Sequence, residues 1–308
     1  MTTSLQLPLV GAGGETVDLA RTLNSHGFAE LAPSSLDEEA TTLHVTVRVP
    51  GARPRRIGIG PGDSTTAARI EVLGPAAGPR VRQAALEGAA HVLRLDHDLS
   101  GFYERIGADP DLAWAATGAG RMLRSPTVFE DVVKTICTTN CAWGATVRMV
   151  NALVSTLGDP AIGGDGPLTN AFPAPSAMAE APERFFRDVV RAGYRSPYLI
   201  ELARRVASGS VDLEALSGSE ADGIPDDDVE RILLDLPGIG PYAAAHVMMT
   251  LGRSSRLILD SWTRPKYARL VGKTTLVPDA TIARRFRRYG DHAGLAFWLF
   301  LTRDWVED

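Results

Sequence analysis

Residues 236 to 260 read LPGIGPYAAAHVMMTLGRSSRLILD, and this stretch decides the fold. Its PGIG motif predicts a tight turn, and Pro241 suits the first turn of a following helix, where its missing N–H costs nothing. A partner helix is predicted over residues 226–234, DDDVERILL, because its apolar positions fall on one side. Two helices joined by a Gly-rich turn make a helix-hairpin-helix at about residues 226–251. Its bare turn amides and the positive end of the second helix favour one phosphate group.

An acidic residue follows the hairpin. Asp260 comes after the apolar run Leu257, Ile258 and Leu259 and directly before Ser261, which is a predicted helix N-cap. Many helix pairs use a PGIG turn. The acid at this distance makes the pattern more specific.

The two features together resemble the helix-hairpin-helix DNA glycosylase superfamily, which pairs the hairpin with a Gly/Pro-rich loop and a catalytic Asp. Further segments resemble the first long helix and base-gap loop, the wedge segment and the last helix of 8-oxoguanine glycosylases: residues 125–130 with 136–140, 192–198 and 289–296. The bacterial 3-methyladenine glycosylases share this plan. The resemblance covers about residues 112–308 well and the first hundred residues only loosely.

The resemblance and the periodicity predict an α+β fold. Residues 43–49, 56–59 and 68–72 alternate apolar and polar positions, which indicates a small antiparallel β-sheet in an N-terminal domain over residues 1–108. Helices are predicted near the sheet. From Leu99 the pattern is helical, and residues 109–308 are expected to form a two-lobed, mostly α-helical glycosylase core. Two loops are predicted within this core, over residues 158–175 and 209–225.

Composition limits the class of protein. The 308 residues are 44% hydrophobic and 22% charged, and no apolar run reaches the length of a membrane span. The first residues carry no signal-peptide pattern, so a cytoplasmic monomer that associates with the nucleoid when acting is expected. Cys137 and Cys141 are interpreted as buried thiols in preference to a metal or redox pair. With two cysteines the chain cannot build the four-cysteine iron–sulfur cluster of some relatives.

The net charge of −5 counts against unspecific affinity for DNA. Its distribution is uneven. Residues 231–308 hold 12 Lys and Arg against 7 Asp and Glu, and the remainder holds 20 against 30. The balance is therefore +5 on the predicted DNA side and −10 elsewhere, which indicates a local basic surface.

Asp260 is the predicted catalytic residue. Cleavage of an N-glycosidic bond builds an oxocarbenium-like sugar, whose charge a nearby carboxylate stabilises while it orients the attacking water. An ordinary N-cap aspartate is the alternative. Tyr242 matches the position at which bifunctional relatives carry a Schiff-base lysine. The resemblance therefore implies a monofunctional enzyme without lyase activity, although Tyr242 could also be a packing residue.

A base pocket is predicted around Tyr242. His246 lies one helical turn further on the same face, and Phe297 and Trp298 add aromatic rings from the last helix. Phe297 and Leu301 match the glutamine and the stacking aromatic of 8-oxoguanine glycosylases, which argues against that substrate. An aromatic pocket favours an electron-poor alkylated base. Interior packing is the alternative for each of these residues.

The resemblance also implies contacts with DNA at other positions. Gly238 and Gly240 would bind a phosphate, Asn140 and Tyr194 would fill the gap left by a flipped base, and Arg195 would read the opposite base. A second opposite-base arginine of the 8-oxoguanine type is Ala145 here. The backbone carbonyls that would hold a monovalent cation, Na⁺ or K⁺, are those of Leu234, Leu236 and Ile239. No other cofactor is expected.

The sequence therefore predicts a monofunctional DNA glycosylase that removes damaged, alkylated purines from double-stranded DNA in base excision repair. A glycosylase for oxidised or deaminated bases is one alternative. A non-catalytic helix-hairpin-helix DNA-binding protein and a chain with no nucleic-acid role are the others.

Overall fold

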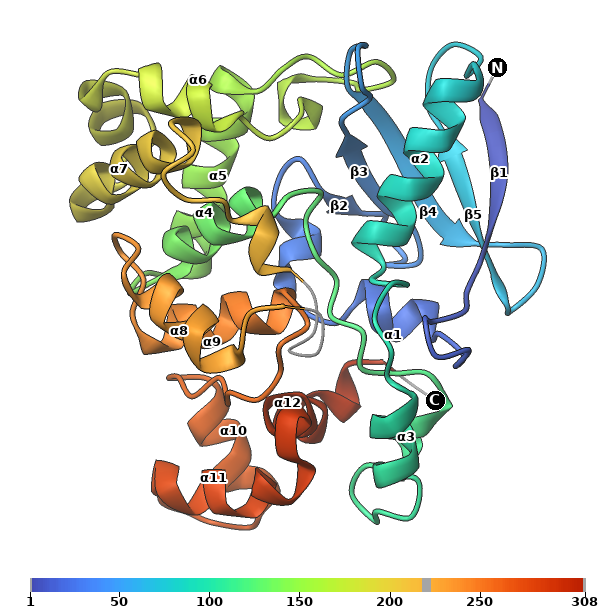
Figure 1. The fold of residues 1–308 in the computed structure, drawn as a ribbon, viewed down its shortest axis with the longest axis vertical. Coiled ribbons are helices and arrows are strands. Elements are labelled where there is room, and N and C mark those ends of the chain that lie inside the picture. Colours follow the sequence, from blue (N-terminus) through green and yellow to red (C-terminus); the bar gives the residue numbers. More distant parts are fainter. Residues whose placement is uncertain (1, 218–222, 307–308) are drawn as a thin grey trace.

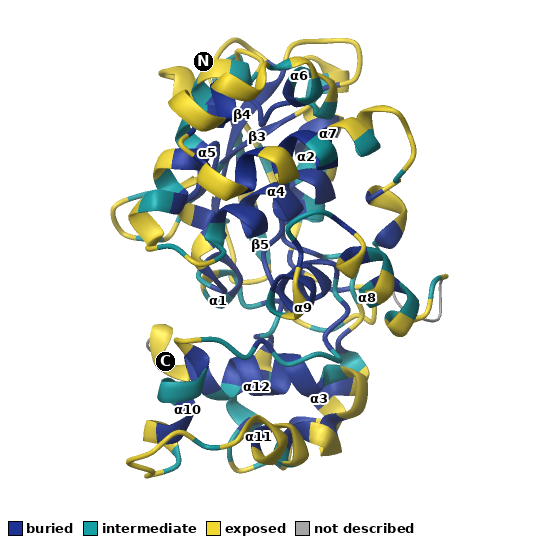
Figure 2. Cartoon of the chain, turned by 90° about the vertical axis from the view of Figure 1, so that its left-hand side faces the viewer, coloured by how far each residue is buried: buried dark blue, intermediate teal, exposed yellow. Residues whose placement is uncertain are grey.

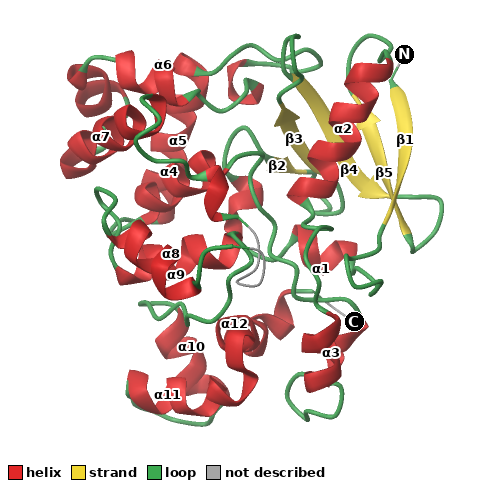
Figure 3. Ribbon diagram, in the orientation of Figure 1, coloured by secondary structure: helices red, strands yellow, loops and turns green. Residues whose placement is uncertain are grey.

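The computed structural model describes residues 2–217 and 223–306 (Figure 1). The fold is α+β, as predicted, with one five-stranded antiparallel sheet and helices over most of the remaining chain (Figure 3). The connector predicted over residues 209–225 includes residues 218–222, which lie outside the described residues.

The sheet lies near the N-terminus and has the strand order β1-β5-β4-β3-β2. The strands have these bounds: β1 Thr3–Pro8, β2 Ser35–Leu36, β3 Leu43–Val47, β4 Arg55–Pro61 and β5 Ala67–Val72. The three predicted strands correspond to β3, β4 and β5, and every neighbouring pair is antiparallel. The edge strands β1 and β2 were not predicted. Helix α2 (Pro79–Val92) lies across the sheet and packs on its apolar side chains.

The other helices gather into two lobes. They have these bounds: α1 Leu19–Leu23, α3 Ser100–Ile106, α4 Val128–Thr138, α5 Trp143–Leu157, α6 Pro175–Glu180, α7 Ser196–Ala207, α8 Asp226–Leu234, α9 Pro241–Thr250, α10 Thr263–Leu270, α11 Asp279–Phe286 and α12 Ala293–Thr302. Helices α4 to α9 enclose one apolar cluster, while α3 and α10 to α12 enclose another. The boundary predicted at residue 108 therefore separates α3 from the helices against which it packs.

Helix α9 belongs to both lobes. Ala243 and Val247 pack in the first cluster, whereas Ala245 and Met249 pack in the second. Because apolar neighbours lie on several sides, α9 is buried over nearly its whole length (Figure 2). Its run of three alanines allows other helices to approach closely, since small side chains add little bulk.

The N-terminal part also reaches the junction of the lobes. Phe28, in the short 3₁₀ turn Gly27–Glu30, packs in the cluster of α4 to α9. Ser25 accepts a hydrogen bond at its backbone oxygen from Trp298 Nε1 of α12, at 2.9 Å. Residues 25–28 are thereby tied to both lobes.

Candidate active site

A cleft of about 1080 Å³ opens where the two lobes and the N-terminal segment meet. It contains most of the residues that the sequence singled out. Its lining comes from residues 26–28, 138–141, 143, 194, 238, 240–243, 246, 259–262 and 298.

The hairpin forms one edge of this cleft. Helix α8 ends at Leu234, α9 begins at Pro241, and Gly238 and Gly240 both line the cleft. Gly238 has φ +82°, and a β-carbon there would lie 2.9 Å from the ring of Tyr198, so both the backbone and the space require glycine. At Gly240 a β-carbon would meet nothing within 4 Å. The helix-hairpin-helix geometry is as predicted.

Asp260 also lines the cleft, and its carboxylate is fixed by backbone amides. Oδ1 accepts hydrogen bonds from the amides of Trp262 at 2.8 Å and Thr263 at 2.7 Å, at the start of α10. The prediction that Ser261 caps this helix is wrong: Trp262 directly precedes its first residue, and the side chain of Asp260 accepts the two amide hydrogen bonds. Within the described residues no hydrogen bond uses Oδ2, so the second carboxylate oxygen is available to a ligand.

The cleft carries little charge apart from Asp260. The described lining residues include no Lys, Arg or Glu and no second Asp. Burial lowers the pKa of His26 to about 4 and that of His246 to about 3, so both rings are neutral near pH 7. Asp260 is therefore the only carboxylic acid among the described lining residues, and its neighbours in the cleft are neutral histidines and other uncharged residue types.

Aromatic side chains form that wall beside α9. Tyr242 and His246 lie one turn apart, with ring centroids separated by 6.1 Å, as their spacing predicted. Phe28 contacts His246 with a centroid separation of 5.0 Å. Burial raises the pKa of Tyr242, and the nearby charge of Asp260 acts in the same direction.

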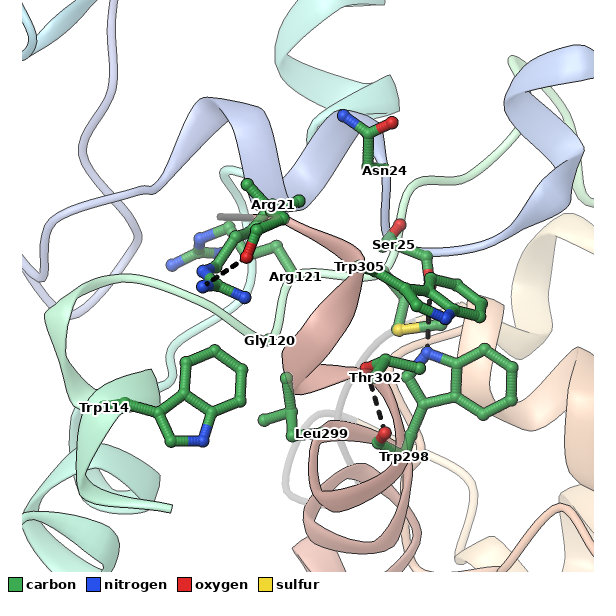
Figure 4. A pocket seen from close by; sticks show the side chains of 12 residues that line it. Arg21, Asn24, Ser25, Trp114, Gly120, Arg121, Trp298, Leu299, Thr302 and Trp305 are labelled. Carbon is green, nitrogen blue, oxygen red and sulfur yellow. Dashed lines mark hydrogen bonds between the residues drawn. The ribbon is translucent and has the colours of Figure 1, made fainter. Parts of the chain in front are cut away.

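Trp298 closes the cleft from α12. Its ring packs on Trp262, with ring centroids 5.7 Å apart. It also packs on Trp305, with centroids 5.8 Å apart, and its Nε1 donates to the backbone oxygen of Ser25 (Figure 4). The pocket on the side of Arg21 and Trp305 leaves only about 20 Å³ of free space. That volume is close to the space of one water molecule, so the larger cleft is the better ligand site.

Phe297 was predicted to line the base pocket, and the structure corrects this. Its side chain is completely buried and packs on Phe286 and Tyr267, with centroid separations of 5.2 and 6.0 Å. Successive residues of a helix point about 100° apart, so Phe297 and Trp298 cannot both face the cleft. Leu301 is also buried in this cluster.

The predicted gap-filling residues lie together at the mouth of the cleft. Asn140 Nδ2 donates to the Tyr194 hydroxyl at 3.2 Å, and Asn140 has φ +46°, a left-handed conformation. Tyr194 is 53% exposed. Arg195 differs from the prediction, because its guanidinium is buried and donates to the backbone oxygen of Thr139. In this conformation Arg195 supports the Asn140 loop and does not face solvent.

Sequence comparison finds relatives whose activities are named. A probable N-glycosylase/DNA lyase of Methanothermobacter thermautotrophicus is 25% identical over 58% of this chain and 61% of its own length. A DNA-3-methyladenine glycosylase of Bacillus subtilis is 30% identical over half of each chain. The chain thus spans half to about three fifths of the lengths of these two relatives. No family model matches it.

Solved structures cover much more of the chain. A 3-methyladenine DNA glycosylase from Archaeoglobus fulgidus aligns with a TM-score of 0.73 over 98% of this chain and 99% of its own, at 19% identity. The chain has the fold of the helix-hairpin-helix DNA glycosylase superfamily. An 8-oxoguanine glycosylase/lyase of Clostridium acetobutylicum bound to double-stranded DNA aligns over 89% of this chain and 99% of its own, with a TM-score of 0.62 at 16% identity.

Several residues of the cleft were not predicted from the sequence. His26 and Phe28 come from the N-terminal part, where the resemblance is weak. Trp143 is 42% exposed beside Gly27, where a β-carbon would come within 3.0 Å of the indole ring. Trp262 directly follows the Asp260–Ser261 pair. The sequence signal for both was a tryptophan that lies within three residues of a predicted site residue, Asn140 for Trp143 and Asp260 for Trp262.

The remaining ligand predictions concern the backbone and the cysteines. The helix-hairpin-helix turn is closed by Ile239 N–H donating to Leu236 O at 3.2 Å, and cation binding by the carbonyls of Leu234, Leu236 and Ile239 stays a prediction. In the described part of the chain no three His, Cys, Asp or Glu side chains cluster as metal ligands. Cys137 is buried, as predicted, while Cys141 is half-buried and lines the cleft.

Proposed function

We propose that this chain is a monofunctional DNA glycosylase that hydrolyses the N-glycosidic bond of alkylated purines in duplex DNA and so starts base excision repair. One observation carries the proposal: a single carboxylate, Asp260, stands in an aromatic-lined cleft beside a helix-hairpin-helix. A cationic base and a sugar cation are both attracted by that charge. The activities of the relatives provide independent support for the reaction class.

The proposed reaction begins with a flipped nucleotide. The amides at Gly238 and Gly240 bind a backbone phosphate just 3′ of the lesion, while Asn140 and Tyr194 occupy the space that the base leaves in the duplex. The base enters the cleft and stacks against aromatic rings, among which Tyr242 and Trp298 are accessible.

Asp260 then acts on the sugar. The C1′–N bond of the damaged base breaks, its electron pair leaves with the base, and positive charge develops at C1′. The fixed carboxylate stabilises this charge and orients a water molecule whose oxygen bonds to C1′. An N7- or N3-alkylated purine is already cationic and departs as a neutral molecule, so no general acid is needed.

A lyase step is not part of the proposal. That step needs an amine nucleophile in the cleft, and no described lining residue is a lysine. Lys266 pairs with Asp304 at 2.5 Å, and Lys134 is buried against Glu130. Tyr242 therefore occupies the cleft where an amine would be required.

The test is a panel of duplexes that each carry one lesion, assayed for alkali-labile sites. Release of N7-methylguanine or N3-methyladenine by the wild-type chain, and its loss in Asp260→Asn, is the expected result. Salt-dependent DNA binding without any base release would favour the non-catalytic alternative. Absence of DNA binding at low salt would contradict both.

An oxidised or other neutral base is the second candidate substrate. It is favoured by a buried polar atom, His246 Nε2, that has no protein partner among the described residues.

A further inference from the structure

Among the described residues that line the cleft, His246 alone has a buried polar side-chain atom without a hydrogen-bond partner. The residue is 8% exposed, and its Nε2 makes no hydrogen bond within the described structure. Buried polar atoms are nearly always paired, because an unpaired one loses its bonds to water without compensation. His246 also lines the cleft, whereas Nε2 itself is closed to solvent, so a bound base that takes Nε2 as its hydrogen-bond partner must displace the side chains around it.

The neighbours of His246 fix its ring without satisfying it. Both nitrogens of His26 are occupied, Nε2 by the backbone oxygen of Leu123 at 2.6 Å and Nδ1 by the amide of Phe28 at 3.3 Å. His26 lies 5.9 Å from His246, ring centroid to centroid, and Phe28 lies 5.0 Å away. The imidazole is therefore packed between these rings, and its Nε2 has no hydrogen-bond partner among the described residues.

The ring is also neutral. Burial, together with the proximity of His26, lowers the pKa of His246 to about 3. A neutral imidazole keeps one N–H donor and one acceptor, and it does not repel a cationic base. It can therefore share the cleft with an alkylated purine and still offer a polar contact to an uncharged one.

Cationic and neutral purines place different demands on the cleft. In both cases the C1′–N9 bond breaks, the electron pair leaves with the purine, and the oxygen of water bonds to C1′. An N7-alkylated base becomes neutral on leaving, and the proton of water passes to solvent. A neutral base develops negative charge as the bond breaks and finally takes up the proton of water. A hydrogen bond to its edge stabilises that developing charge.

We propose that His246 hydrogen-bonds the edge of the flipped base and thereby extends the activity to uncharged purine lesions. The inference rests on the proposed glycosylase function and adds a substrate class to it. His246 is then a specificity residue whose contribution is large for neutral leaving bases and small for cationic ones.

Single-turnover excision from two matched duplexes tests this inference, one with N7-methylguanine and one with hypoxanthine. We expect the wild type to release both bases, with hypoxanthine slower. The variant His246→Phe keeps an aromatic ring and loses both nitrogens. This variant should lower the rate of hypoxanthine release at least roughly tenfold more than the rate of N7-methylguanine release. A difference of this size is expected when one hydrogen bond that stabilises developing charge is lost. His246→Gln, which keeps a donor, should restore part of the difference.

Controls separate a specificity role from a structural one. His44→Phe changes a half-buried histidine of β3, outside the cleft, and should leave both rates unchanged. An equal loss of both rates in His246→Phe, or no loss, would overturn the inference, as would a wild type that releases N7-methylguanine and no hypoxanthine. A wild type that releases neither base contradicts the proposed function itself.

Discussion

Asp260 and Thr263 exchange hydrogen bonds. The amide of Asp260 donates to Thr263 Oγ1 at 2.8 Å, and the amide of Thr263 donates to Asp260 Oδ1 at 2.7 Å. This reciprocal pair of hydrogen bonds lies at the start of helix α10 and fixes the carboxylate of Asp260 through its Oδ1 atom. A single residue thus satisfies the helix terminus and presents a negative charge to the cleft, so the capping and catalytic interpretations of Asp260 are compatible.

The first prediction separates these two roles. Asp260→Asn keeps an oxygen that can accept both amide bonds and removes the charge. It should therefore leave thermal stability and DNA binding close to wild type while lowering single-turnover base release at least roughly a hundredfold. Near-normal excision by this variant would show that Asp260 is only a cap.

A matched variant tests how far the cap orients the carboxylate. Thr263→Val removes the Oγ1 acceptor from the pair and keeps the charge of Asp260. We expect a smaller loss of rate than in Asp260→Asn, with a stability loss of about 1 kcal/mol, the usual scale of a helix cap. A rate loss as large as that of Asp260→Asn would instead make the cap essential.

The second prediction concerns strand cleavage. Because Tyr242 stands in the cleft and the described lining includes no lysine, the wild type should form no Schiff base. Borohydride should trap no protein–DNA adduct, and breaks should appear only after alkali or an added abasic endonuclease. A bifunctional glycosylase assayed in parallel is the positive control. A trapped adduct would assign the nucleophile to Lys266, Lys273 or the N-terminal amine and contradict the monofunctional proposal.

The third prediction uses the open space at Gly240. Gly240→Asp and Gly240→Asn add side chains of nearly equal size where a β-carbon meets nothing within 4 Å, at the N-cap of α9. Both should fold normally, since Asp and Asn are favourable N-caps. Only the aspartate places a negative charge at the proposed phosphate site, so it should weaken binding to abasic-analogue DNA more strongly. Equal affinities at moderate salt would show that the hairpin does not hold a phosphate there.

The fourth prediction follows from the correction of Phe297. Since this ring is fully buried between Phe286 and Tyr267, Phe297→Ala should lower the free energy of unfolding by about 3–5 kcal/mol. Phe297→Leu should cost less and keep excision per folded molecule unchanged. Trp298→Leu, at the next position, should lower excision because that ring lines the cleft. Denaturant unfolding and single-turnover rates on the same samples distinguish packing from substrate contact.

The helix-hairpin-helix and three strands could be predicted because short-range patterns encode them. PGIG followed by Pro241 specifies a turn and a helix start, and strict alternation in β3 specifies one buried face. The edge strand β2 has two residues, too few for a pattern. Ser261 is a favourable N-cap residue type, but the amides at the start of α10 bond to the side chain of Asp260, one position earlier.

The limits of prediction in the cleft have a different cause. His26 and Phe28 reach it across more than 200 residues of sequence from His246, and no local pattern records such a contact. Phe297 and Trp298 are adjacent aromatics on a helix that is apolar on every side, so periodicity does not distinguish the buried ring from the accessible one. The resemblance to the glycosylases located the helix, and the rotation of that helix determined which side chain faces the cleft.

The last prediction is the order of substrate preference. Asp260 is the only carboxylic acid among the described lining residues, none of which is Lys or Arg, and both lining histidines are neutral near pH 7. The cleft therefore favours a cationic base and the sugar cation. An alkylated purine also has a weakened glycosidic bond, and its departure needs no proton donor. An uncharged base depends on hydrogen bonding for the same step, and one imidazole gives less assistance than a full positive charge on the base. N7-methylguanine and N3-methyladenine should therefore be released faster than 8-oxoguanine from otherwise matched duplexes. Competitive excision from methylated and oxidised DNA, followed by chromatography of the freed bases, measures this order directly. If 8-oxoguanine dominates the released fraction, stacking and charge do not set the preference, and the oxidised-base alternative replaces the alkylated one.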